Sequence, residues 1–302
     1  MEPQPPRHAY LIMSHGNFPI LEKQLRFLDS QNADFYIHID KKVKNFDFDK
    51  FRDLPENSRV TFVERHSISW GDFSMVKAEL SLLRSAVPGN YDYYHLLSGV
   101  DVPIKSREYI ESYFSQRPGT NFINFQHPDI SRQNLWRVRF YYPFQRWNIR
   151  VPALRRLLRN ATMAAQLVLG TDRTRKLPPM TFQKGAQWFD ITHGLAEYIL
   201  SKETEIWSAF SRTYCPDEMF VHTAVINSPL WDTLPPNAFD DDNACCCRYI
   251  DWRRGNPYTF TDGDFEELVN AGPDYLFARK FDYSAFPGIV DRLFAYFSES
   301  TA

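Results

Sequence analysis

The first hundred residues alternate between short apolar stretches and longer amphipathic stretches, and this alternation restricts the folds open to the chain. Four stretches have the length and apolar content of buried strands: Ala9–Ser14, Phe35–Ile39, Arg59–Glu64 and Tyr93–Leu97. Two others, Pro19–Asp29 and Ser74–Ala86, repeat apolar residues every three or four positions, which predicts helices. Strands that alternate with helices form a mostly parallel sheet covered by helices, so the sequence predicts the α/β class.

The length and composition are those of an ordinary globular protein. A chain of 302 residues with 43% hydrophobic content can bury a large core. We expect a disordered tail over residues 1–8 and a single domain over residues 9–298, closed by an amphipathic helix around Ile289–Phe297. The net charge of −2 provides no basic field, so we expect no nucleic-acid partner.

Cysteine usage and the N-terminal residues indicate a compartment. Cys215 and the run Cys245–Cys247 contain no paired zinc-site spacing, and adjacent cysteines do not readily bridge each other. Reduced thiols indicate a reducing environment. The first seven residues lack the apolar stretch of a signal peptide, and no run of about 18 apolar residues occurs. These features predict a cytoplasmic location.

Polar residues follow three of the predicted strands. Ligands of parallel sheets bind where the strands end, and His15, Asp40 and the turn Ser98–Asp101 fall at such ends. Asp40 either contacts a ligand or caps a loop, and Gly99 is a residue that most tight turns require.

The segment Tyr214–Phe220 places two carboxylates before an apolar run. Proline favours the first turn of a helix and acids favour its positive end, so Pro216–Glu218 predicts a helix start that Asp217 caps. Glu218 is either a second capping acid or a catalytic base.

Five further segments accompany Tyr214–Phe220: Tyr10–His15, Tyr36–Lys42, Ser69–Glu79, His95–Ile104 and Phe277–Asp282. Together the six resemble, in order, the Core-2/I-branching glycosyltransferase family, which includes branching β-1,6-N-acetylglucosaminyltransferases and peptide O-xylosyltransferases. The resemblance covers about Ala9 to Asp282. It implies a GT-A nucleotide-sugar fold, with Asp40 near the uridine, Ser98, Gly99 and Asp101 near the diphosphate and donor sugar, and Glu218 as the catalytic base.

The resemblance also implies catalysis without a metal ion. A metal-dependent GT-A enzyme carries Asp-x-Asp after a strand, because hard cations prefer carboxylate oxygens. Asp47-Phe48-Asp49 lies among lysines and Asp240–Asp242 lies in a Pro- and Asn-containing loop, so we expect both to be solvated surface. Basic side chains replace the metal in the family. Lys280 matches one of them, and Arg254 or Arg253 either matches its partner or forms a solvent-facing basic pair.

Acceptor residues are less clearly marked. The segment Gly185–Thr192 resembles a family segment, and its Trp188 either stacks on a sugar face or fills the core. Arg137 lies where the family makes acceptor contacts. Trp252 either flanks the site or belongs to a buried strand.

Basic residues surround an apolar stretch within 150–176. Such a segment either lies on an anionic membrane surface, which suits a lipid-linked acceptor, or packs on the domain with its arginines in water. The first alternative would place the cytoplasmic protein at the inner face of the membrane.

Two functions remain open. The first is inverting, metal-independent transfer of a sugar from a UDP-α-sugar to a hydroxyl of a glycan, glycolipid or polysaccharide, forming a β-linkage. N-acetylglucosamine is the expected sugar and xylose the alternative. The second is a non-catalytic protein that binds nucleotide sugars or glycans. The presence of both Glu218 and Lys280 favours the enzyme, with no cofactor beyond the UDP-sugar.

Overall fold

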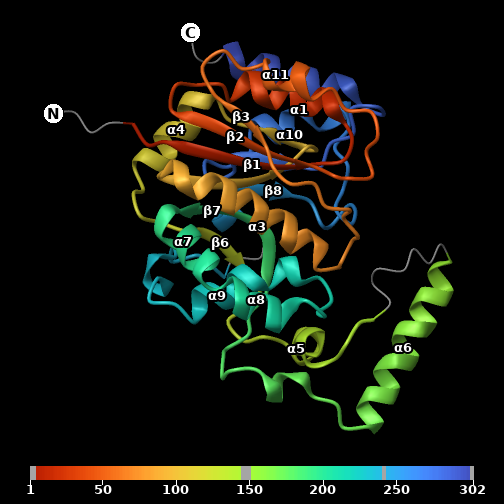
Figure 1. Cartoon of the computed structure of the whole chain (residues 1–302). Coiled ribbons are helices and arrows are strands. Elements are labelled where there is room, and N and C mark those ends of the chain that lie inside the picture. The colour runs from red at the N-terminus through yellow and green to blue at the C-terminus, as the bar shows by residue number, and fades with distance from the viewer. Residues whose placement is uncertain (1–4, 144–150, 240–242, 300–302) are drawn as a thin grey trace.

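A computed structural model of the chain describes residues 5–143, 151–239 and 243–299 (Figure 1). The strands are β1 (His8–Ser14), β2 (Ala33–Ile39), β3 (Val60–Phe62), β4 (Tyr93–Ser98), β5 (Asp101–Pro103), β6 (Phe122–Phe125), β7 (Gly185–Thr192), β8 (Arg248–Ile250) and β9 (Phe277–Arg279). The α-helices are α1 (Phe18–Phe27), α2 (Phe48–Arg52), α3 (Ser74–Ala86), α4 (Arg107–Ser115), α5 (Arg132–Arg139), α6 (Pro152–Val168), α7 (His193–Ser201), α8 (Glu203–Phe210), α9 (Phe220–Ile226), α10 (Phe265–Val269) and α11 (Pro287–Glu299).

The main sheet has the strand order β3-β2-β1-β4-β7-β6. The first four strands are parallel, and β7 runs antiparallel to both of its neighbours. The predicted α/β class and the predicted strands are therefore confirmed, and α3 has the predicted bounds. The carboxyl ends of β1, β2 and β4 meet at one edge of the sheet.

Helices cover both faces of the main sheet. Side chains along each strand alternate between the two faces, and the apolar side chains on each face pack against helices. On β1, Leu11 packs in one apolar cluster with residues of α3, α7 and α9. Its neighbour Ile12 packs in a second cluster with residues of α1 and α4. The core thus forms two apolar layers, one on each side of the sheet (Figure 1).

A smaller sheet of order β5-β9-β8 lies beside the first, and α10 and α11 pack in its apolar cluster. Arg248 on β8 links the two sheets, since its guanidinium forms two hydrogen bonds, 2.8 and 2.9 Å long, with the carboxylate of Asp190 on β7. Both side chains are fully buried. Arg248 also donates to the carbonyl of Leu96 on β4 at 3.0 Å, so β8 is tied to two strands of the main sheet.

Two of the predicted boundaries need correction. The strand β1 begins at His8, which is buried, so the predicted boundary at Ala9 falls one residue inside it. Pro216–Glu218 forms a single 3-10 turn, and the α-helix begins only at Phe220. The long helix α6 projects from the sheet and its covering helices (Figure 1).

The four cysteines are buried thiols, and none of them forms a disulfide. No helix in the described parts of the chain has the length and apolar character needed to cross a membrane.

Candidate active site

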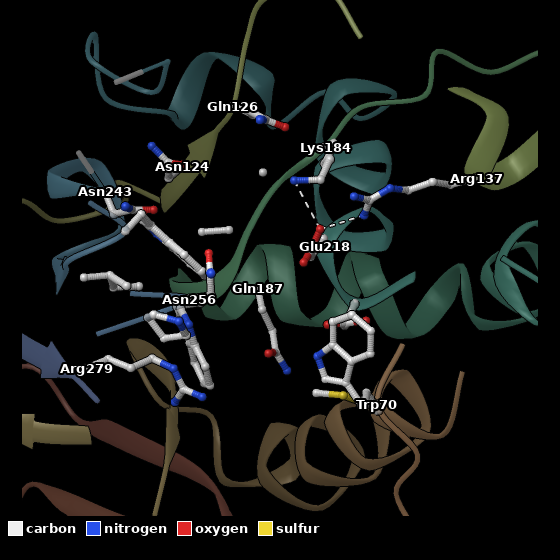
Figure 2. Close-up of a pocket in the computed structure, with 18 residues that line it drawn as sticks. Trp70, Asn124, Gln126, Arg137, Lys184, Gln187, Glu218, Asn243, Asn256 and Arg279 are labelled. Carbon is white, nitrogen blue, oxygen red and sulfur yellow. Dashed lines mark hydrogen bonds and ion pairs between the residues drawn. The ribbon is translucent and has the colours of Figure 1, made fainter. Parts of the chain in front are cut away.

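A cleft of about 610 Å³ is lined by residues of β6, β7, β8 and β9 and of the loops beside them (Figure 2). Of the predicted site residues, the cleft is lined by Arg137, Trp188, Glu218 and Trp252. It is also lined by residues to which the sequence assigned no role, among them Trp70, Lys184, Gln187 and Arg279. Side chains from α5, β7, β9 and the turn before α9 therefore meet in one place.

Glu218 lies between two cations. Its Oε2 accepts a hydrogen bond of 2.7 Å from Arg137 Nη1 and lies 3.1 Å from the Lys184 ammonium (Figure 2). Burial opposes ionisation of Glu218, but Lys184 and Arg137 outweigh it, and the pKa of this carboxyl is lowered. Among the described residues Oε1 has no hydrogen-bond partner, although it is not sealed from solvent. Glu218 is thus an ionised carboxylate with one oxygen free.

The turn that carries Glu218 is unusual in its backbone. Cys215 adopts the left-handed conformation, with φ 47° and ψ 61°, and its N–H donates to the carbonyl of Gly71. The following 3-10 turn ends at Glu218 and reverses into α9. This geometry presents residues 217 and 218 to the cleft instead of to a helix terminus.

The prediction that Asp217 caps a helix is wrong. Its side chain makes no capping hydrogen bond, because it points inward and is buried at 6% exposure. Burial, followed by the charge of Glu218, raises the pKa of Asp217 to about 7. Glu79 on α3 is its electrostatic neighbour, and burial, followed by Asp217, raises the pKa of Glu79 as well. Two buried acids that favour the neutral form therefore lie together, Asp217 in the wall of the cleft and Glu79 behind it.

We expect Asp217→Asn to stabilise the protein more at pH 8 than at pH 4.5. A carboxyl with a raised pKa keeps its proton in the folded state after the unfolded chain has lost it, so stability falls as pH rises from about 4 to about 7 and stays low above. The amide removes this loss. The free energy of unfolding of the variant, relative to the original protein, should rise by about 1 kcal/mol or more between the two pH values, as urea titrations would measure.

Asp264→Asn is the matched control for that experiment. Burial opposes the charge of Asp264, but hydrogen bonds from Thr261 and Arg254 outweigh it and lower its pKa. Its contribution to stability is lost only as pH falls below about 4, so the relative stability of this variant should change little between pH 8 and pH 4.5. Parallel pH profiles for the original protein and Asp217→Asn would contradict the assignment of a raised pKa to Asp217.

Arg279 is held at the end of β9 by a buried carboxylate. Asp101 pairs with Arg279 across β5 and β9 and accepts a hydrogen bond of 2.7 Å from its Nη1. Asp101 also accepts from the Ser98 N–H at 2.7 Å and from the Ser98 hydroxyl at 2.9 Å. The guanidinium lies 4.2 Å from the centre of the Trp188 ring. Asp101 is fully buried and does not line the cleft, so its role is to position Arg279.

The other residues predicted near the donor gather at the same edge of the sheet. The N–H of Asp40 donates to the carbonyl of Ser14 at 2.9 Å, and that of Gly99 donates to Met13 at 2.9 Å. A Cβ on Gly99 would lie 2.9 Å from the Cβ of Ser14, so the close approach of β1 and β4 requires glycine. His15 is exposed just beyond β1. None of these residues lines the cleft itself, and Ser98 connects them to it through its hydrogen bond with Arg279.

The two arginines predicted to accompany Lys280 lie outside the cleft. Arg254 is surrounded by carboxylates: it contacts Asp251, Asp264 at 2.7 Å and Glu267 at 2.5 Å. Arg253 is exposed, and its backbone N–H donates to Asp251. Lys280 does not line the cleft either. It is half-buried next to Arg279, and within the described part of the chain its ammonium forms no ion pair. Three carboxylates leave Arg254 without net positive charge to offer a ligand.

Aromatic rings of different exposure border the cleft. Trp188 is buried at 6% exposure and belongs to the apolar core, with Arg279 over its ring. Trp252 and Trp70 are 54% and 67% exposed. Trp252 follows β8 and does not belong to it. Trp252 and Trp70 are therefore the rings with faces open to a ligand.

Within the described residues, no group of three or more His, Cys, Asp or Glu side chains is placed to hold a metal ion. Asp47 and Asp49 are exposed; Asp47 caps α2 and Asp49 pairs with Arg52. The prediction of a solvated surface is confirmed there, while Asp240–Asp242 lies outside the described residues.

Sequence reasoning missed two cations of the cleft. Arg279 directly precedes Lys280 in the segment Phe277–Asp282, and Lys184 directly precedes Gly185–Thr192. Arg279 lies within a segment that resembles the family, and Lys184 adjoins one, so the sequence gave a signal for both. Their roles were missed because their ion pairs, with Asp101 and Glu218, connect residues far apart in the chain.

Comparisons with known proteins agree with this architecture. The model of the Core-2/I-branching enzyme family matches residues 8–269, and the chain belongs to that family of glycosyltransferases. The class is therefore that of a glycosyltransferase. The GT-A type of fold stays an expectation from the family resemblance.

Two of the relatives of this chain are xylosyltransferases. Rat xylosyltransferase 1 (Rattus norvegicus) is 24% identical over 319 residues, covering 98% of this chain and 36% of the relative. Mouse xylosyltransferase 2 (Mus musculus) is 27% identical over 302 residues, covering 92% and 32%. The chain thus spans about a third of the length of these relatives. The apo crystal structure of mouse xyloside xylosyltransferase 1 aligns over 90% of this chain and 97% of that chain, at 10% identity and a TM-score of 0.38.

Proposed function

We propose that the protein is an inverting, metal-independent glycosyltransferase that moves a sugar from a UDP-α-sugar to an acceptor hydroxyl. The observation that carries the proposal is the carboxylate of Glu218 in a cleft that also contains Arg279. The carboxylate of Glu218 can accept a proton and the guanidinium of Arg279 can bind an anion. Both side chains line the cleft. Family membership supplies the reaction class.

The leaving group is a diphosphate whose negative charge grows as the sugar departs. Arg279 presents a guanidinium fixed by Asp101, and the neighbouring Lys280 offers an ammonium without an ion pair among the described residues. Fixed cations of this kind stabilise developing charge. Because Arg254 is neutralised by three carboxylates, we assign the diphosphate to Arg279 and Lys280 in preference to Arg254 or Arg253.

The attacking hydroxyl needs a base within hydrogen-bond reach. Oε1 of Glu218 has no partner in the described structure, whereas Oε2 is held by Arg137 and Lys184. We propose that the acceptor hydroxyl transfers its proton to Oε1 of Glu218 as the hydroxyl oxygen attacks the anomeric carbon. Attack opposite the diphosphate inverts the anomeric centre and forms a β-linkage.

The pH dependence tests this assignment. We expect Lys184→Met to move the acid limb of the kcat/KM profile to higher pH, since removing this cation raises the pKa of Glu218. Lys202→Met is the matched control, because Lys202 pairs with Glu205 on the surface. An acid limb that stays in place in Lys184→Met would argue that another group limits the rate at low pH.

For the donor sugar, the names of the relatives favour xylose over the N-acetylglucosamine expected from the sequence. We propose UDP-xylose as the first donor to test and UDP-N-acetylglucosamine as the second, with a glycan, glycolipid or polysaccharide as the acceptor. A ligand at about 100 times its dissociation constant adds about 2.7 kcal/mol of stability, so a thermal-shift panel of nucleotide sugars identifies the donor. Binding without any turnover or donor hydrolysis would favour a non-catalytic carbohydrate-binding protein.

We expect activity to survive excess EDTA, within about twofold of the untreated rate. In a metal-dependent enzyme the bound cation is among the largest charges in the site, so chelation abolishes turnover. Here Arg279 and Lys280 provide the positive charge. Loss of activity on chelation, with recovery on addition of manganese or magnesium, would oppose the proposal.

A further inference from the structure

Helix α6 is attached to the body through its C-terminal half and through the segment immediately after it. The side-chain amide of Gln166 accepts from the Tyr141 N–H at 2.8 Å and donates to the Tyr141 carbonyl at 3.0 Å. Beyond the helix, the buried Arg173 donates to the carbonyls of Val138 and Ala209 at 3.0 and 2.8 Å. These contacts set the rotation of α6 about its own axis.

The polar face of α6 is the one that packs against the protein. Arg159, Thr162 and Gln166 recur at intervals of three and four residues and therefore lie on one face. Gln166 is buried, and Arg159 and Thr162 are half-buried. In most globular proteins the apolar face of a surface helix takes this position.

The apolar face consequently points into solvent. Leu154, Leu157 and Val168 are 45%, 64% and 88% exposed, and the exposed residues Ala161 and Ala164 lie between them on the same face. Figure 1 shows α6 apart from the sheet and its covering helices. An exposed apolar face of this size on a projecting helix marks an interaction surface.

The charge of α6 distinguishes between two possible partners of its apolar face, a second copy of the helix and a membrane. Residues 151–171 contain three arginines and no acidic residue, in a chain whose net charge is −2. The exposed side chain of Arg156 lies off the apolar face. A second copy of this helix would bring more positive charge, whereas an anionic bilayer offers both an apolar interior and complementary charge.

We propose that α6 docks the protein on the surface of an anionic membrane, with Leu154, Leu157 and Val168 inserted below the headgroups. The helix lies in the plane of the interface and does not cross the bilayer. Helix α5, which supplies Arg137 to the cleft, is on the same side of the molecule as α6 (Figure 1). If the proposed function holds, docking brings the cleft to acceptors carried on lipid.

Vesicle flotation of the whole protein, without donor or acceptor, tests the docking separately from transfer. We expect binding to phosphatidylcholine vesicles that contain about 30 mol% phosphatidylglycerol, weaker binding to phosphatidylcholine alone, and loss of binding at high salt. The double variant Leu157→Gln, Val168→Gln should bind at least roughly tenfold more weakly, because two inserted side chains are lost. Arg156→Gln should weaken binding to the anionic vesicles alone.

Tyr296→Gln is the matched control, an apolar-to-amide change at a position 45% exposed on α11, far from α6. Circular dichroism establishes that each variant is folded. Absence of binding to either vesicle, or equal binding by the double variant, overturns the proposal. So does a dimer in lipid-free light scattering that the double variant converts to a monomer, since a second copy would then cover this face. None of these outcomes depends on whether the protein transfers a sugar.

Discussion

Glu218→Gln should lower the rate of sugar transfer by roughly 10² or more and leave the affinity for UDP unchanged, because the amide preserves the size of the side chain but accepts no proton. The affected oxygen is Oε1, which has no partner in the described structure. Steady-state kinetics and UDP titration by calorimetry would measure the two effects. Stability should fall by about 1–3 kcal/mol, since Arg137 and Lys184 lose their shared counter-charge.

Glu267→Gln is the matched control for this variant. Glu267 also accepts from an arginine, Arg254, but lies outside the cleft. Its loss should change transfer by less than about twofold, as for a surface residue away from the chemistry. Near-normal transfer by Glu218→Gln would remove Glu218 from the role of base.

Arg279→Met and Lys280→Met should each lower kcat/KM by roughly 10² and weaken UDP binding at the same time. Each variant removes a cation proposed to act on the diphosphate in both the ground state and the transition state, which is why affinity and rate fall together. Calorimetry with UDP and initial rates with the UDP-sugar measure the two quantities. Lys280→Met is the simpler of the two, because Lys280 holds no carboxylate in the described structure.

Arg279→Met also leaves the buried carboxylate of Asp101 without its cation, so its stability must be measured alongside its activity. Arg279→Lys keeps the charge and separates the two effects, since it should retain more UDP binding than Arg279→Met. Arg254→Met provides the comparison with the arginine first suggested by the sequence. If Arg254→Met weakens UDP binding as much as Arg279→Met does, the assignment of the diphosphate to Arg279 fails.

The elements of the sheet were predictable because their signals are local. The strand Tyr93–Leu97 is specified by a short apolar run and the helix Ser74–Ala86 by apolar residues at period 3.6, and the structure places both as predicted. The position of Glu218 in the cleft was also marked, since it belongs to a segment that resembles the family. The start of α9 was misplaced, because a local rule for Pro216 and Asp217 could not anticipate the left-handed Cys215 and the buried turn after it.

What the sequence by itself determined is therefore the α/β class, the order of the strands and helices along the chain, and the segments from which the cleft is built. Only the tertiary structure decided which charges in those segments are free. Arg254 and Arg279 are the same residue type, and three carboxylates surround the first, whereas the second reaches the cleft over Trp188. The pattern of α6 specified an apolar face, but the contacts of Gln166 turned that face to solvent. The physical reason is common to both cases: periodicity is encoded by neighbours in sequence, whereas charge compensation and the direction of a face depend on contacts between residues far apart in the chain.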